Sequence, residues 1–144
     1  MTSVVAERAT PRTPFAAAPR SPRTVRVALA GCGTVGAALV SLVRRQAALF
    51  ETRHGVRFAF TSILVRDPAK DRGVPIEPGL LTTSVEHFLA ADADVVIEVI
   101  GGADPAERVV RASLAAGRRV VTANKALIAQ HGPALQALAD AHGA

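Results

Sequence analysis

Short apolar runs alternate with longer stretches of helical periodicity from Val25 to the end of the chain. The runs have the length and the composition of buried strands. They are VRVALAG (25–31), FAFTSILVRD (58–67), ADVVIEVIGG (93–102) and RRVVTANK (118–125). The third run is apolar almost throughout, which is typical of a parallel sheet covered on both faces.

Helical periodicity predicts helices over 33–50, 85–91, 104–117 and 125–143. Ser84 and Asp104 stand at expected N-caps, Pro105 at a first helical position, and Gly117 just after a last turn. The last helix is expected to break at the Gly-Pro pair 132–133.

The first helix is expected to bury one apolar face. The side chains predicted to line this face are Val35, Ala38, Leu39, Leu42, Val43 and Leu49. Residues 68–83 are rich in Pro, Gly and charge, and we predict a loop there. Strands that alternate with helices in this way predict a doubly wound α/β domain with a mostly parallel sheet and right-handed crossovers.

Residues 1–23 mix Pro, Arg, Ala, Ser and Thr without an apolar period, so we predict a disordered N-terminal extension followed by one folded domain, 24–144. The arginines of the extension resemble those of an organelle transit peptide. Because Ala and Arg are heavily used along the whole chain, a plain extension is the better interpretation. The first 26 residues carry five arginines and one glutamate, so most of the net charge of +5 lies there.

Composition excludes several classes of function. The remaining cations are not interleaved with aromatic residues, so no nucleic-acid surface is expected. No apolar run approaches the roughly 18 residues that a membrane span needs, so we expect no membrane partner and a cytoplasmic location. Cys32 is the only cysteine and the four histidines are scattered, so no disulfide and no metal site is predicted.

A glycine-rich loop joins the first strand to the first helix. Gly31, Gly33 and Gly36 have the G-x-G-x-x-G spacing in the strand–loop–helix context that binds a dinucleotide in Rossmann-type folds. The first glycine allows the sharp turn, the second leaves room for a pyrophosphate, and the third lets helix and strand pack closely. Cys32 lies inside this loop, where a redox role is conceivable but a small filler is the simpler interpretation.

The end of the second strand is the position that distinguishes NAD from NADP. An acid there bonds the ribose 2′-hydroxyl of NAD, whereas an arginine suits the 2′-phosphate of NADP. Here Arg66 precedes Asp67, and Lys70 and Arg72 follow. We expect NADP, with NAD possible through Asp67, while a solvated charge cluster without a ligand is the alternative.

The third and fourth strands end at the same edge of the predicted sheet. There Asn124 either meets a ligand or caps the next helix, and Lys125 either meets the nicotinamide or a substrate oxygen or points to solvent. Glu98 is one carboxylate in an apolar strand. It either bonds neighbouring backbone N–H groups, which we favour, or lies near the ligand.

Three segments together resemble the nucleotide-binding domain of homoserine dehydrogenases, with matching order and spacing. They are VRVALAGCGTVG, ADVVIEVIGGADPA and AAGRRVVTANKALIAQHG. The T-A-N-K segment after an E-x-I-G-G strand is more specific than the glycine loop. The resemblance implies reversible hydride transfer between NAD(P)H and aspartate semialdehyde to give homoserine, on the route to threonine and methionine.

The resemblance also implies which residues bind the nicotinamide dinucleotide. In this resemblance the glycine loop binds the pyrophosphate, and Arg66 contacts the 2′-phosphate. The backbone at Ile100 and Gly101 and the side chain of Lys125 lie on the nicotinamide and substrate side. The implied set is Gly31, Gly33, Thr34, Val35, Gly36, Arg66, Ile100, Gly101 and Lys125.

The family continues into a substrate-binding and dimerisation domain that carries the proton-transfer residues. This chain stops at Ala144, where that domain would begin. We therefore expect no catalytic residue here, a sheet incomplete at its C-terminal edge, an inactive or nearly inactive chain, and a homo-oligomer only for a full-length parent. The alternatives are a related dehydrogenase acting on aspartate or a semialdehyde, and a stand-alone NAD(P) sensor.

Overall fold

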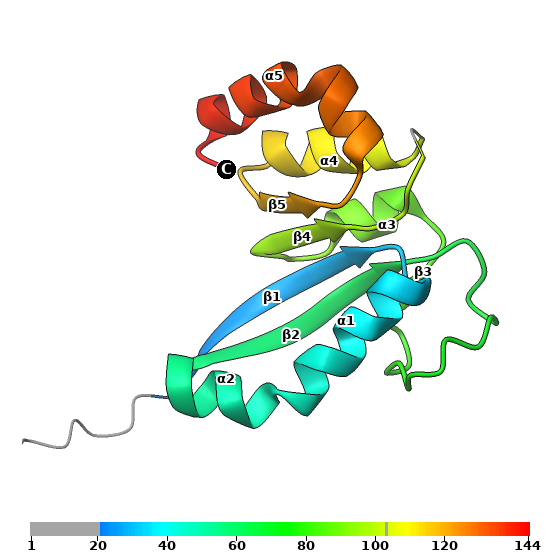
Figure 1. Ribbon diagram of the computed structural model, residues 1–144, viewed down its shortest axis with the longest axis vertical. Helices are drawn as coiled ribbons and strands as arrows, with labels where there is room; N and C mark the ends of the chain where they lie inside the picture. The colour runs from blue at the N-terminus through cyan, green and yellow to red at the C-terminus, as the bar shows by residue number, and fades with distance from the viewer. Residues whose placement is uncertain (1–20, 103) are drawn as a thin grey trace, which may run out of the picture.

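The computed structural model describes residues 21–102 and 104–144, which fold around one parallel sheet (Figure 1). In this part of the chain the sheet has five strands in the order β3-β2-β1-β4-β5. The strands are β1 (Arg23–Ala30), β2 (Val56–Leu64), β3 (Leu81–Thr82), β4 (Val95–Glu98) and β5 (Arg119–Thr122). Every neighbouring pair is parallel, which confirms the predicted doubly wound α/β class.

Helices connect the strands and cover both faces of the sheet (Figure 1). They are α1 (Thr34–Arg45), α2 (Ala47–His54), α3 (Val85–Ala90), α4 (Ala106–Ala115) and α5 (Lys125–His142). The predicted extension, 1–23, lies almost wholly outside the described residues, and its last residue, Arg23, already begins β1. Within the described parts of the chain, no helix has both the length and the apolar composition needed to span a lipid bilayer.

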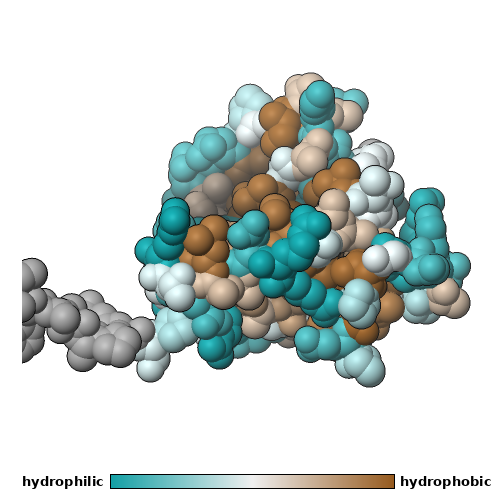
Figure 2. Space-filling model, turned by 60° about the horizontal axis from the view of Figure 1, so that its bottom comes forward, coloured by the Kyte–Doolittle hydropathy of each residue, from teal (hydrophilic) through white to brown (hydrophobic). Residues whose placement is uncertain are grey.

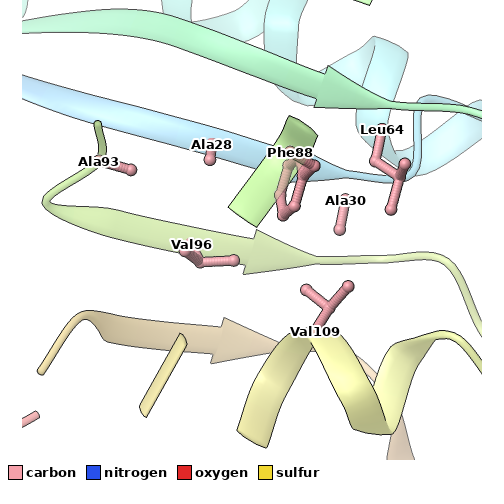
Figure 3. Packing of buried hydrophobic residues seen from close by; sticks show 7 residues of the cluster. All are labelled: Ala28, Ala30, Leu64, Phe88, Ala93, Val96 and Val109. Carbon is pink, nitrogen blue, oxygen red and sulfur yellow. The ribbon is translucent and has the colours of Figure 1, made fainter. Parts of the chain in front are cut away.

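The alternation of side chains along β1 divides the core into two layers. Ala28 and Ala30 point to the face covered by α3 and α4, where Phe88 and Val109 meet them (Figure 3). Leu29 points to the opposite face and packs with Val40 of α1. A third cluster joins α4 to α5 through apolar side chains, which are Val110, Leu114, Leu127 and Leu135.

The predicted first helix is wrong in two respects. It ends at Arg45, and a second helix follows Gln46. Its buried residues are Gly36 and Val40, whereas several side chains of the predicted face are exposed, namely Val35, Ala38, Leu42 and Leu49. The close contact of Gly36 with Gly31 decides which side of the helix meets the sheet, and periodicity alone does not reveal that contact. Figure 2, which turns the lower part of Figure 1 forward, shows apolar patches among the polar side chains.

Other boundaries also differ from the prediction. Helix α4 begins at Ala106 with Pro105 in the cap position, so Asp104 is not its N-cap. Helix α5 runs without a break through Pro133, so the break predicted at 132–133 is wrong. The predicted 68–83 loop contains the short strand β3. At the other edge of the sheet, Val121 of β5 is 57% exposed. The Ser84 cap is confirmed by its bond from the His87 N–H.

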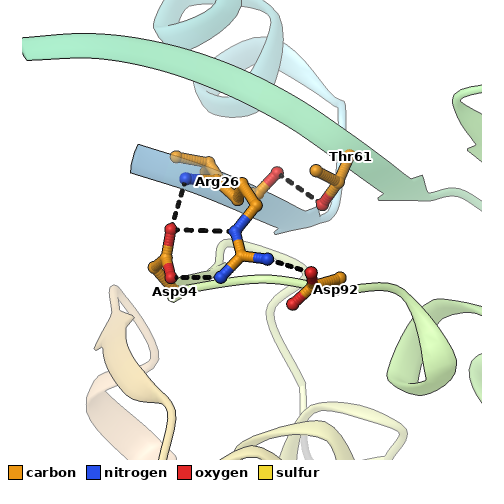
Figure 4. Close-up of polar contacts among 5 residues, drawn as sticks. Arg26, Thr61, Asp92 and Asp94 are labelled. Atoms are coloured by element: carbon orange, nitrogen blue, oxygen red, sulfur yellow. Dashed lines mark hydrogen bonds and ion pairs between the residues drawn. The ribbon is translucent and has the colours of Figure 1, made fainter. Parts of the chain in front are cut away.

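The amino ends of β1 and β4 are joined by ion pairs (Figure 4). Arg26 donates through its Nε and a terminal nitrogen to Asp94 at 3.1 and 2.7 Å, and its backbone N–H donates to the same carboxylate at 2.8 Å. A further terminal nitrogen of Arg26 pairs with Asp92. These bonds from Arg26 hold the pKa of Asp94 well below its ordinary value.

Candidate functional site

The carboxyl ends of the strands carry most of the predicted site. Because all strands are parallel, the loops after β1, β2, β4 and β5 leave the same edge of the sheet. The order places β1 and β4 side by side although they are far apart in sequence, and connections leave them in opposite directions. Ligands of such sheets bind at this switch point.

At two glycines after β1, Gly31 and Gly36, neighbouring backbone atoms leave no room for a side chain. Gly31 has φ +101°, and a Cβ there would lie 2.9 Å from the Ile100 nitrogen and from the Val99 carbonyl. A Cβ on Gly36 would lie 2.2 Å from the Gly31 carbonyl oxygen. The sharp turn and the close helix packing expected from the spacing are therefore both present.

The third glycine faces open space. A Cβ on Gly33 would meet no atom within 4 Å, and its backbone is extended at φ −82°. Gly33 is also the N-cap of α1, where no side chain accepts a hydrogen bond from the first turn and no acidic residue follows. Thr34 and Val35, the first residues of the helix, are both exposed. The N–H groups and the positive dipole end of α1 are thus open to an anion.

A cationic cavity lies beside this helix start. Its volume is about 370 Å³, and its lining includes Gly33 from the loop with Arg66, Asp67 and Lys70 from the segment after β2. Neither Arg66 nor Lys70 has a side-chain partner among the described residues. One oxygen of Asp67 accepts the Ala69 N–H at 2.9 Å, which orders the segment. The cavity therefore offers unpaired cations to a negatively charged group.

Arg72 holds this segment in place. Its guanidinium donates to the backbone carbonyls of Lys70, at 2.5 Å, and of Asp67. Cys32 lies next to Arg72, and burial raises the pKa of its thiol although the Arg72 charge opposes that rise. A neutral, buried thiol fits the simple filler role, because thiolate formation is disfavoured.

A second cavity, of about 410 Å³, spans the switch point. Gly31 and Arg66 line one part of it, and Ile100 and Gly101 line another. The structure thus brings together predicted residues from three loops. Lys125 is not among the residues that line either cavity.

Asn124 and Lys125, which both follow β5, differ in their side-chain contacts. The Asn124 side chain accepts the Leu127 N–H at 3.1 Å, so the capping role that the sequence left open is observed. Lys125 begins α5, is exposed, and has no side-chain partner in the described parts of the chain. It follows β5 at the same edge of the sheet from which Ile100 and Gly101 follow β4.

Glu98 has the backbone-bonding role that the sequence favoured. Its side chain is fully buried, and one oxygen accepts the Ile100 N–H at 2.7 Å and the Gly101 N–H at 3.3 Å. The other accepts the Thr122 hydroxyl at 2.5 Å. The sequence singled out the T-A-N-K segment that begins with Thr122 but did not predict that the Thr122 hydroxyl would bond Glu98.

The arrangement suits binding of a long, negatively charged ligand. It provides an open helix N-terminus, unpaired cations on one side and exposed backbone on the other. Among residues 21–102 and 104–144, no cluster of three or more His, Cys, Asp or Glu side chains could hold a metal ion. The glycine cradle at Gly33 fits a diphosphate, since any side chain there would fill the space that the phosphates need.

Known proteins of one family are similar to this chain in sequence and fold. Residues 31–144 match the family model described as homoserine dehydrogenase, NAD binding domain. The homoserine dehydrogenase of Mycobacterium bovis is 40% identical over 126 residues, which cover 86% of this chain and 28% of the relative. The chain thus spans under a third of the length of this relative.

Solved structures agree with the sequence match. A Staphylococcus aureus homoserine dehydrogenase superimposes with a TM-score of 0.78 at 33% identity, over 85% of this chain and 31% of that one. A hyperthermophilic archaeal homoserine dehydrogenase in complex with NADPH shares the fold with a TM-score of 0.67 at 24% identity, over 84% of this chain and 42% of that one. The chain belongs to the homoserine dehydrogenase family, and the part matched is its NAD-binding domain.

Proposed function

We propose that this chain binds NADPH across the switch point and forms the cofactor-binding part of a homoserine dehydrogenase. The diphosphate lies over Gly31 and Gly33 and accepts hydrogen bonds from the first-turn N–H groups of α1, at Thr34, Val35 and Gly36. The observation that carries this proposal is the uncapped, acid-free N-terminus of α1 beside the open space at Gly33.

The cations after β2 bind the adenosine 2′-phosphate. Arg66 and Lys70 line the same cavity as Gly33 and lack side-chain partners within the described residues. A guanidinium can bond two phosphate oxygens at once, which favours Arg66 as the main contact. One Asp67 oxygen accepts the Ala69 N–H, and within the described residues the other is free to accept a hydrogen bond from the ribose hydroxyl of NADH. Because NADH has no 2′-phosphate for Arg66 to contact, it binds more weakly than NADPH.

The nicotinamide half extends towards β4 and β5. The backbone at Ile100 and Gly101 receives it, and the exposed ammonium of Lys125 stands near its far end. The bound cofactor supplies the hydride in the complete enzyme, which we propose interconverts aspartate semialdehyde and homoserine. The residues of this chain bind and orient the cofactor, and Lys125 offers a cationic donor to a substrate oxygen.

The replacement Gly33→Ala tests the diphosphate cradle. Its Cβ meets no protein atom within 4 Å, so the melting temperature should fall by no more than the few degrees that alanine costs at an N-cap. NADPH affinity, measured by the change in NADPH fluorescence on titration, should fall by about tenfold or more because the methyl group occupies diphosphate space. Gly132→Ala in α5 is the matched control, since its Cβ would make only ordinary contact at 3.6 Å and lies away from the proposed site. Unchanged affinity in the Gly33 variant would contradict the proposal.

A further inference from the structure

Glu98 is a buried charge that cofactor binding itself does not explain. It stands at the carboxyl end of β4 with 0% of its surface exposed. A carboxylate is costly to bury unless its oxygens accept hydrogen bonds. Both oxygens do so here, one from the Ile100 and Gly101 N–H groups and the other from the Thr122 hydroxyl.

The contacts continue from Thr122 back to the segment after β4. The Thr122 hydroxyl oxygen accepts the Asn124 N–H at 3.0 Å. The Asn124 side-chain amide donates to the Gly102 carbonyl at 2.5 Å and accepts the Leu127 N–H. Glu98, Thr122 and Asn124 therefore form a polar bridge between the loop after β4 and the start of α5.

The polar bridge fixes a loop that contains two consecutive glycines. Gly101 and Gly102 have φ values of +74° and +80°, which favour glycine, and glycine loses more conformational freedom on folding than any other residue. Glu98 fixes the N–H groups of Ile100 and Gly101, and Asn124 fixes the carbonyl of Gly102. Ile100 and Gly101 in turn line the cavity at the switch point.

The position of the polar bridge assigns it to one half of the ligand. The switch point lies between β1 and β4, and Arg66 marks the β2 side as the phosphoadenosine half. The polar bridge joins β4 to β5 on the other side and ends next to Lys125. It therefore serves the nicotinamide half, provided that the proposed function holds.

We propose that Glu98, acting through Thr122, is a positioning residue that pre-orders the loop 99–102 for the nicotinamide half of the cofactor. The carboxylate does not touch the ligand in this account. It holds the receiving backbone in its binding conformation before the cofactor arrives, which lowers the ordering cost of binding.

The test separates positioning from plain stability by using two ligands. Thr122→Val keeps the side-chain shape but removes the hydroxyl, and Thr122→Ser restores it. Calorimetry should show NADPH affinity falling by about tenfold in the valine variant, recovering in the serine variant, while affinity for adenosine 2′,5′-bisphosphate changes by less than about threefold. Thr24→Val, on the exposed amino end of β1, is the matched control and should change neither affinity.

Each other outcome has a definite meaning. If the valine variant binds NADPH as the unaltered chain does, or if it loses both ligands equally, Glu98 has no positioning role although the proposed cofactor site stands. If the unaltered chain binds neither ligand, the proposed function itself is wrong. Should Thr122→Val not fold, Glu98→Gln decides the question, since it keeps the acceptor for Ile100 and Gly101 but removes the charge. The same split between the two ligands is then expected, at about fivefold for NADPH, and its absence contradicts the inference.

Discussion

Arg26, near the amino ends of β1 and β4, differs from Arg66 and Lys125, at the carboxyl ends of the strands, in how its charge is paired. At the amino ends of β1 and β4, Arg26 is bonded to Asp94 and Asp92, so its positive charge is balanced within the protein (Figure 4). At the carboxyl ends, Arg66 and Lys125 have no side-chain partner among the described residues. The Arg26 cation is thus paired within the protein, whereas Arg66 and Lys125 are available to a ligand.

The helix N-termini at the carboxyl end show the same contrast on a smaller scale. Helix α5 is capped by Asn124, whereas α1 begins after Gly33 without a side-chain cap. A cap satisfies the orphan N–H groups internally, and an uncapped start leaves them for an anion. Helix α4 also lacks a side-chain cap but has Glu107 in its first turn, whereas α1 has neither a cap nor an acid there, which fits the proposal that α1 receives an anion.

The largest expected effect comes from breaking the carboxyl end itself. Gly36→Ala would place a Cβ 2.2 Å from the Gly31 carbonyl oxygen, and neither backbone can move without shifting α1 off the sheet. We expect the free energy of unfolding to fall by about 3 kcal/mol or more, measured by urea denaturation. Gly132→Ala, in the interior of α5, should leave stability unchanged or slightly raised. A Gly36 variant as stable as the parent would show that the contact is not needed.

The second effect concerns the unpaired arginine. Arg66→Ala should weaken NADPH binding by about tenfold to a hundredfold, because a charge-assisted contact with the 2′-phosphate is lost. NADH binding, which has no such phosphate, should change by less than about twofold. Arg53→Ala, an exposed arginine on α2, should alter neither affinity in the same calorimetric titrations. Equal losses for both coenzymes would remove Arg66 from the 2′-phosphate role.

The smallest effect is expected at the paired end. Asp94→Asn keeps the shape of the side chain but removes the charge that Arg26 stabilises. Because the folded pKa of Asp94 lies below its ordinary value of 3.8, the stabilisation is complete above that value and is lost as the pH falls towards the folded pKa. The variant should melt a few degrees lower than the parent at pH 7, and the gap should close in acid. A gap that is constant across the pH range would mean that the charge is not responsible.

The sequence predicted the parts of the fold that depend on local pattern. The long strands, the α/β class and the glycine turn follow from apolar runs and from spacing, and the structure contains them. The buried face of α1 was wrong because the Gly36–Gly31 contact sets the rotation of the helix. Strand β3 was missed because two residues, Leu81 and Thr82, are too few to show any period.

In the candidate site, too, the sequence predicted what depends on local spacing and missed what depends on distant contacts. Its glycines and Arg66 were recognisable from the sequence because each stands at a fixed offset from a strand end. The role of Thr122 was not, since its hydroxyl bonds a carboxylate 24 positions away in sequence. The ordering of the β2–β3 loop by Arg72 also depends on backbone carbonyls, which every residue has.

The central claim is that the open carboxyl end binds a phosphorylated dinucleotide through its unpaired cations. Isothermal titration calorimetry of the unaltered chain with NADPH and with NADH tests this claim most directly. We expect saturable binding at one site per chain, with NADPH the tighter ligand. Equal affinity for the two coenzymes would contradict the role of the cations, and the absence of heat with either would contradict the site as a whole.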